Sequence, residues 1–245
     1  FKYALLALLI VPVTMALVPT TTKPEEVGLS SERLQRVREA MQRHIDAKTV
    51  SGVVTLVARK GRIAHLEAQG LMDIEAKKPM PKDGIFRLAS MSKPITGAAV
   101  MMLVEEGKIR LNDPVSRFIP EFKNLNKVAV AKPGAQAGGG GRGGAPAPGG
   151  RGAPPPEFDT VSASREITIK DLLTHGSGLM SGGLGNSVAP QRAPTDTLAT
   201  YIPKLAGVPL DFQPGTLWRY SGLAGFDVLG RIVELASGQT YDRFL

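Results

Sequence analysis

Residues 86–96 read F-R-L-A-S-M-S-K-P-I-T, with the tetrapeptide Ser90-Met91-Ser92-Lys93 just before an apolar run of helical spacing. Side chains three residues apart on a helix are neighbours, so this spacing brings a hydroxyl nucleophile beside an amine base. If Ser90 opens the helix, its amide is an unpaired first-turn donor that can bind an oxyanion. The stretch therefore predicts acyl transfer, with a serine N-cap followed by a solvated lysine as the alternative. Ser92 either helps to orient the site or is satisfied by the backbone of the first turn.

Two further stretches add specificity to this pattern. Residues 172–179 read L-L-T-H-G-S-G-L, and residues 214–222 read P-G-T-L-W-R-Y-S-G. The S-x-x-K pattern alone is a weak signal, whereas three such stretches in this order are far more specific. Together they resemble the serine β-lactamase-like family, which comprises class C β-lactamases, D-alanyl-D-alanine carboxypeptidases and related esterases. The resemblance runs from about Val27 to the last residue.

The resemblance implies a fold and a set of site residues. The implied fold is α/β (α+β) of the β-lactamase/penicillin-binding transpeptidase type, with an antiparallel sheet flanked by helices and a mostly helical subdomain. Tyr220 matches the tyrosine of the family's Y-x-N motif, so the expected catalytic residues are Ser90, Lys93 and Tyr220. The alternative for Tyr220 is a core aromatic side chain with a hydrogen-bonded hydroxyl. Gly222 replaces the motif's asparagine, which can bond a substrate amide, and this favours ester substrates.

His175 suggests a Ser–His–Asp arrangement instead, with Asp171 or Asp227 as the third member. Against this alternative, Ser177 and Ser181 lack the G-x-S-x-G elbow that presents a serine nucleophile to such a histidine. The T-H-G-S-G-L stretch also matches a structural loop of the family. We therefore expect His175 to have a structural role.

The composition excludes several kinds of site. The chain of 245 residues contains no cysteine and only three histidines, His44, His65 and His175. These counts exclude a disulfide scaffold, a thiol nucleophile and a thiolate metal site, and the histidines are too scattered for H-E-x-x-H. We therefore expect no metal and no cofactor. The net charge of +8 is carried by dispersed residues without a nucleic-acid motif, so we expect no nucleic-acid partner.

The ends and one internal segment define the expected organisation. Residues 1–23 place Lys2 before an apolar run, which predicts a signal peptide or an uncleaved membrane anchor and hence a periplasmic or extracellular protein. Residues 24–245 are expected to form a partial β-lactamase-like domain. Glycine and proline dominate residues 133–156, which we expect to be a disordered insertion. The family's Lys/His-x-Gly motif, with the second oxyanion amide, is expected beyond residue 245, so we expect a C-terminally truncated and inactive fragment.

Local patterns in the first part of the chain predict one helix and one hairpin. Ser30 is expected to cap a helix. The apolar positions of this helix recur at helical spacing, at Leu34, Val37, Met41 and Ile45. Two β-rich runs at 53–58 and 63–68 predict a hairpin.

Two longer helices and a capping box are predicted in the second part. One helix begins near Ser90 and ends before Gly107, and the other runs over 223–236 and ends before Gly238. Residues 168–171 have the spacing of a capping box, with aspartate in place of the usual glutamate or glutamine.

The leading functional hypothesis is an exported serine hydrolase that cleaves esters or amides through an acyl-enzyme on Ser90, with a carboxylesterase favoured. A β-lactamase or a D-alanyl-D-alanine carboxypeptidase is the alternative among enzymes. A non-catalytic ligand-binding protein on the same scaffold is an alternative of another class. The expected partner is a small-molecule ester or amide substrate, and the oligomeric state is left open.

Overall fold

The computed structural model describes residues 21–132 and 157–245. The predicted insertion at 133–156 and residues 1–20 of the predicted leader lie outside this described part. The chain forms two compact units, of which the first ends at Arg87 and the second begins at Leu88. Among the helices of the described ranges, none is both long and apolar enough to cross a membrane.

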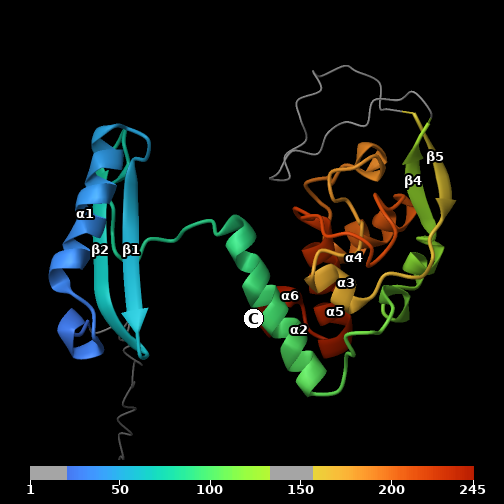
Figure 1. Ribbon diagram of the computed structural model, residues 1–245, viewed down its shortest axis with the longest axis horizontal. Helices are drawn as coiled ribbons and strands as arrows, with labels where there is room; N and C mark the ends of the chain where they lie inside the picture. Colours follow the sequence, from blue (N-terminus) through green and yellow to red (C-terminus); the bar gives the residue numbers. More distant parts are fainter. Residues whose placement is uncertain (1–20, 133–156) are drawn as a thin grey trace, which may run out of the picture. The chain divides into compact units, whose positions relative to one another are not determined.

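The first unit joins a helix to a three-stranded antiparallel sheet. The helix is α1 (Ser31–Asp46), and the strands, in sheet order, are β1 (Gly52–Arg59), β2 (Arg62–Asp73) and β3 (Lys78–Pro79). The predicted hairpin is confirmed as β1 and β2, and α1 lies along it (Figure 1). Ser30 caps α1 as predicted, because its hydroxyl oxygen accepts a hydrogen bond from the Arg33 amide at 3.2 Å.

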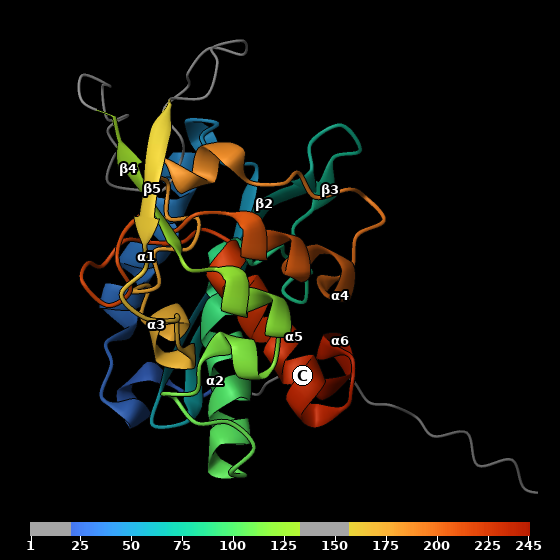
Figure 2. The same cartoon turned by 90° about the vertical axis from the view of Figure 1, so that its right-hand side faces the viewer.

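The second unit is mainly helical. Its α-helices are α2 (Ser92–Glu105), α3 (Ile169–Leu173), α4 (Leu198–Tyr201), α5 (Ala224–Ser237) and α6 (Tyr241–Phe244). Helices α2 and α5 pack against each other (Figure 1, Figure 2). The predicted ends of both helices are confirmed, because Gly107 and Gly238 adopt left-handed φ values of 72° and 75° just beyond them. The predicted capping box of α3 is also present, with Thr168 and Asp171 bonding each other's backbone amides.

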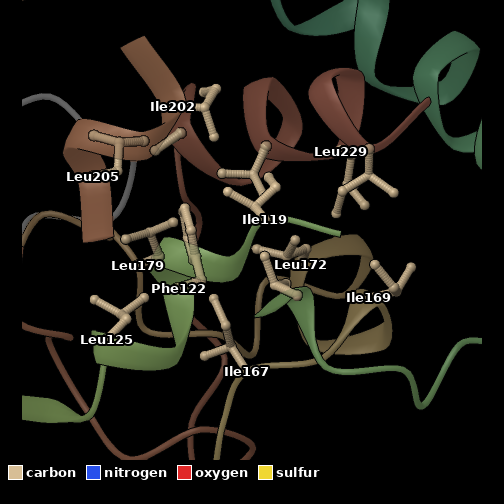
Figure 3. Close-up of a cluster of buried hydrophobic side chains, with 14 of the residues drawn as sticks. Ile119, Phe122, Leu125, Ile167, Ile169, Leu172, Leu179, Ile202, Leu205 and Leu229 are labelled. Carbon is tan, nitrogen blue, oxygen red and sulfur yellow. The ribbon is translucent and has the colours of Figure 1, made fainter. Parts of the chain in front are cut away.

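Buried side chains from distant parts of the second unit form its core (Figure 3). Phe122 from a 3₁₀ segment, Leu172 from α3 and Leu229 from α5 are each almost fully buried in one cluster. Burying a side chain of this size stabilises a fold by roughly 1.5–3 kcal/mol. The core therefore fixes α3 and α5, and with them the loop after α3 that carries His175 and the loop before α5 that carries Tyr220.

One strand pair escaped the sequence-based prediction. Strands β4 (Lys127–Ala131) and β5 (Phe158–Ser162) pair in antiparallel register, and β4 also exchanges backbone hydrogen bonds with Leu210. Each strand has five residues, and the whole insertion separates them along the chain. No local turn signal therefore marks the pair. With both sheets antiparallel and flanked by helices, the predicted fold class is confirmed.

Ser90 lies just before α2 rather than at its first residue. Ala89–Met91 is a 3₁₀ turn in which the Met91 amide donates to the Leu88 carbonyl at 3.0 Å, and α2 begins at Ser92. The predicted helix start near Ser90 is therefore confirmed to within two residues, although Ser90 itself does not open the α-helix. Ala89 has a left-handed φ of 48°, so right-handed helical backbone angles begin only after it.

Candidate active site

The second unit brings Ser90, Lys93 and Tyr220 together. The Tyr220 hydroxyl donates to Ser90 Oγ at 2.6 Å, and Lys93 Nζ donates to the same oxygen at 3.1 Å. Ser90 and Lys93 come from the entry to α2, whereas Tyr220 comes from the loop before α5. Among the described residues, the Ser90 amide makes no backbone hydrogen bond. The cluster therefore combines a hydroxyl, an amine and a phenol with a free amide, as serine activation requires.

Lys93 is held from two sides. Its Nζ also donates to the Gly222 carbonyl oxygen at 2.7 Å. The same nitrogen lies 4.9 Å from the ring centroid of Tyr220 and 5.6 Å from that of Phe226. Such placement over aromatic faces favours a cation. The contact with Gly222 has no sequence signal, because every residue carries a backbone carbonyl.

The phenol of Tyr220 lies in an environment that favours its ionised form. Hydrogen bonding with Lys93, and then with Ser90, holds the pKa of the Tyr220 phenol below its usual value of about 10. The positive charge of Lys93 acts in the same direction, and partial burial of the ring opposes both effects. Tyr220 can therefore exchange a proton with Ser90 across their 2.6 Å contact.

The Ser–His–Asp alternative is not assembled. His175 Nδ1 accepts a hydrogen bond from the Ser221 amide at 3.2 Å, and no carboxylate within the described ranges bonds its ring. The carboxylate of Asp171 instead accepts two hydrogen bonds from Arg165, at 2.5 and 2.9 Å. Asp227 forms its ion pair with an arginine, at 3.8 Å. The described residues therefore form no Ser–His–Asp arrangement at His175, and its structural role stays a prediction.

Asp211 fixes the loop that follows His175. Its carboxylate accepts four hydrogen bonds, at 2.7–3.0 Å, from the segment 181–185. Gly178 allows a close approach in the same loop, since a Cβ there would lie 2.6 Å from the Phe212 carbonyl oxygen. These contacts hold the histidine loop against the segment that leads to the candidate tyrosine. Sequence reasoning missed Asp211, because a single aspartate carries no information on which distant amides it will bind.

A cavity of about 320 Å³ opens beside Lys93. Phe226 gives it an apolar wall, and Arg192 and Asp227 give it charged groups. Ser92 also lines the cavity, and within residues 21–132 and 157–245 its hydroxyl makes no hydrogen bond to the backbone, so of its two alternatives the backbone-satisfied one is not observed. In the same ranges, no cluster of three or more histidine or carboxylate side chains offers a metal position. The cavity therefore lies on the Lys93 side of the cluster, between the start of α2 and helix α5.

Comparison with known proteins identifies relatives over most of the chain. A family model described as Beta-lactamase matches residues 37–245. Protein Rv1367c of Mycobacterium tuberculosis is 41% identical over 195 residues, which cover 77% of this chain and 42% of that protein. Esterase EstB of Burkholderia gladioli is 37% identical over 198 residues, which cover 77% of this chain and 41% of that protein.

Solved structures that are similar to this chain include a hydrolase and a penicillin-binding protein homologue. EstCE1, a hydrolase with promiscuous acyltransferase activity, is 30% identical with a TM-score of 0.64, over 86% of this chain and 49% of that one. The octameric penicillin-binding protein homologue from Pyrococcus abyssi is 21% identical with a TM-score of 0.60, over 86% and 41%, and shows a likeness of fold alone. The chain spans less than half the length of each of these relatives. The chain therefore belongs to the beta-lactamase family of serine hydrolases, whose members include esterases.

Proposed function

We propose that this chain carries the nucleophile of a carboxylesterase that works through an acyl-enzyme on Ser90. The observation that carries the proposal is the convergence of two proton-transfer groups on Ser90 Oγ, the Tyr220 hydroxyl at 2.6 Å and Lys93 Nζ at 3.1 Å. The similarity to Esterase EstB supports an ester as the substrate.

In the proposed acylation step, Ser90 Oγ attacks the ester carbonyl carbon and passes its proton to the Tyr220 phenolate. Hydrogen bonding with Lys93 and Ser90 lowers the pKa of the Tyr220 phenol, which favours this phenolate, and the Lys93 charge acts in the same direction. The carbonyl oxygen becomes an oxyanion that accepts a hydrogen bond from the Ser90 amide. The alcohol then leaves with the proton from Tyr220, and the acyl group remains on Ser90.

Deacylation reverses the proton path. Water attacks the acyl carbonyl and gives its proton to the Tyr220 phenolate. Collapse of the second tetrahedral intermediate releases the carboxylic acid, and Ser90 regains a proton from the Tyr220 phenol. Lys93 transfers no proton in this scheme, and its hydrogen bond to the Gly222 carbonyl holds its amine beside the phenol.

Gly222 supports the proposal that the substrate is an ester rather than an amide. Glycine has no side chain with which to bond a substrate amide, and its carbonyl oxygen is already 2.7 Å from Lys93 Nζ. A β-lactamase or a D-alanyl-D-alanine carboxypeptidase is the second candidate, since the matching family model is described as Beta-lactamase. The two candidates differ in whether an amide bond is cleaved.

The test replaces the nucleophile in the full-length protein. Ser90→Ala is expected to abolish labelling by a fluorophosphonate and to lower kcat for p-nitrophenyl butyrate by orders of magnitude, because the covalent route is lost. Ser187→Ala is the matched control, since the hydroxyl of this exposed serine bonds only a backbone carbonyl in the described part of the chain. Undiminished turnover by Ser90→Ala would refute the nucleophile assignment. Acylation by benzylpenicillin with turnover would favour the second candidate, and a wild-type protein that labels with neither probe would favour a ligand-binding protein.

We also propose that the protein is exported. The support is Lys2 ahead of an apolar run within residues 1–23, the pattern of a secretory signal. Fractionation of cells that express the full-length protein is expected to find it outside the cytosol, as a free or membrane-bound form. Retention of the protein in the cytosol with residues 1–23 intact would contradict the proposal.

A further inference from the structure

His175 accepts hydrogen bonds from the residues on both sides of Tyr220 in the chain. The Arg219 amide donates to the His175 carbonyl oxygen at 3.1 Å, and the Ser221 amide donates to His175 Nδ1 at 3.2 Å. These two amides flank Tyr220 along the chain. A single residue therefore fixes the backbone immediately before and immediately after the phenol.

The imidazole ring also packs on the phenol. The ring centroids of His175 and Tyr220 are 4.7 Å apart with an interplanar angle of 47°. Phe226 and Trp218 contact the same imidazole, at 5.5 Å and 6.0 Å between centroids. Aromatic pairs at these separations stabilise each other beyond their burial, so the ring restricts the direction of the Tyr220 side chain.

The hydrogen bonds determine the form of the imidazole. Because the Ser221 amide donates to Nδ1, this nitrogen carries no proton, and the neutral ring has its proton on Nε2. Burial, and then the positive charge of Lys93, lower the pKa of His175, so the neutral ring is the stable one. A neutral ring that bonds a backbone amide is suited to hold its neighbours.

We propose that His175 is a positioning residue that holds the Tyr220 phenol against Ser90 Oγ and transfers no proton itself. The inference rests on the proposed function, in which Tyr220 is the base. The contact at stake is the 2.6 Å hydrogen bond between the Tyr220 hydroxyl and Ser90 Oγ. A displacement of about 1 Å between reacting groups can lower a rate by about 10²-fold.

Three substitutions separate the two contributions of His175. His175→Asn retains an acceptor in the place of Nδ1, and asparagine tolerates the left-handed φ of 58° at this position. His175→Phe retains a ring but loses the acceptor, and His175→Ala loses both. The exposed neighbour offers the matched control Thr174→Ala, since among the described residues the Thr174 hydroxyl bonds only the Lys170 carbonyl.

The measurements are kcat, KM and the pH dependence of kcat for p-nitrophenyl butyrate in the full-length protein. We expect His175→Ala to lower kcat about 10- to 100-fold with little change in KM, and His175→Asn to restore kcat to within a few-fold of wild type. The groups that face the phenol are Lys93, Ser90 and His175. When the phenol leaves Ser90 and Lys93, its pKa rises toward about 10, so the rise of kcat with pH moves to higher pH in His175→Ala.

If His175 only stabilised the fold, His175→Ala would reduce the amount of folded protein. The pH profile of kcat, and kcat per folded molecule, would then stay as in the wild type. The proposal is overturned if His175→Asn is as slow as His175→Ala, or if His175→Ala keeps the wild-type kcat and pH profile. The variant Tyr220→Phe distinguishes an error in the proposed function, in which Tyr220 is the base, from an error in the positioning role of His175. If Tyr220→Phe keeps full activity, the proposed base is wrong, and a large effect of His175→Ala then overturns positioning through Tyr220 as well.

Discussion

Replacing Lys93 by methionine tests how the lysine contributes to the proposed reaction. The substitution preserves an unbranched side chain and removes one positive charge. It also removes the hydrogen bonds of Nζ to Ser90 Oγ at 3.1 Å and to the Gly222 carbonyl at 2.7 Å. If Lys93 acts as a fixed charge, its loss destabilises the Tyr220 phenolate and leaves the rest of the proton path intact.

The distance between Lys93 and Tyr220 gives the expected size of the effect. Two unit charges 4.9 Å apart, the separation of Nζ from the ring centroid, attract by about 1 kcal/mol in water and about 3 kcal/mol at an effective dielectric constant of 20. Because Tyr220 is only half-buried, solvent screens this attraction, and we take about 1.4 kcal/mol, which corresponds to about a tenfold change in rate. Lys93 lowers the pKa of the phenol, so Lys93→Met raises this pKa and reduces the fraction of phenolate at neutral pH.

The assay is kcat/KM for a p-nitrophenyl ester, corrected for spontaneous hydrolysis and measured from neutral to alkaline pH. We expect a loss of about tenfold at neutral pH that shrinks as the pH approaches the phenol's ordinary pKa of about 10. Lys170→Met on α3 is the control for removing a lysine from the same unit. A loss of about a thousandfold or more that persists at alkaline pH would refute this reasoning, because Lys93 would then be the group that moves the proton.

Two further predictions concern the scaffold. Gly178→Ala is expected to destabilise the folded protein by about 1–3 kcal/mol, because Gly178 has a φ of 74° and a Cβ would approach the Phe212 carbonyl oxygen to 2.6 Å; an unchanged thermal midpoint would contradict this. Deleting residues 133–156 and joining the ends with a short Gly-Ser link is expected to leave the thermal midpoint and the esterase rate nearly unchanged, because β4 and β5 are antiparallel partners whose facing ends a short loop can close. Loss of cooperative unfolding in the deletion variant would assign the segment a packed role.

Signals confined to a few neighbouring residues predicted local structure well. The cap at Ser30, the capping box at 168–171 and the helix ends at Gly107 and Gly238 all follow from side-chain or φ requirements of the residue itself. The S-x-x-K spacing likewise placed Lys93 Nζ within 3.1 Å of Ser90 Oγ.

Features that depend on long-range backbone contacts escaped prediction. The β4–β5 pair joins strands on either side of a long insertion, and Asp211 binds amides some thirty residues earlier in the chain. His175 accepts hydrogen bonds from the backbone amides of the residues before and after Tyr220. Every non-proline residue carries a backbone amide, so the sequence gives no signal for these contacts. The convergence of Tyr220 on Ser90 was expected only through the resemblance to a family, since nothing in the spacing of residues 130 apart requires it.

At Gly222, the backbone and the side-chain position have separate roles. The backbone at 222 anchors the lysine, while the side chain at 222 is free to change, since a Cβ there would meet no other atom within 4 Å among the described residues. A side chain at this residue can therefore vary without disturbing the anchor of Lys93. Under the proposed function, position 222 is then a place where a substitution can change the substrate preference while Ser90 and Lys93 keep their contact.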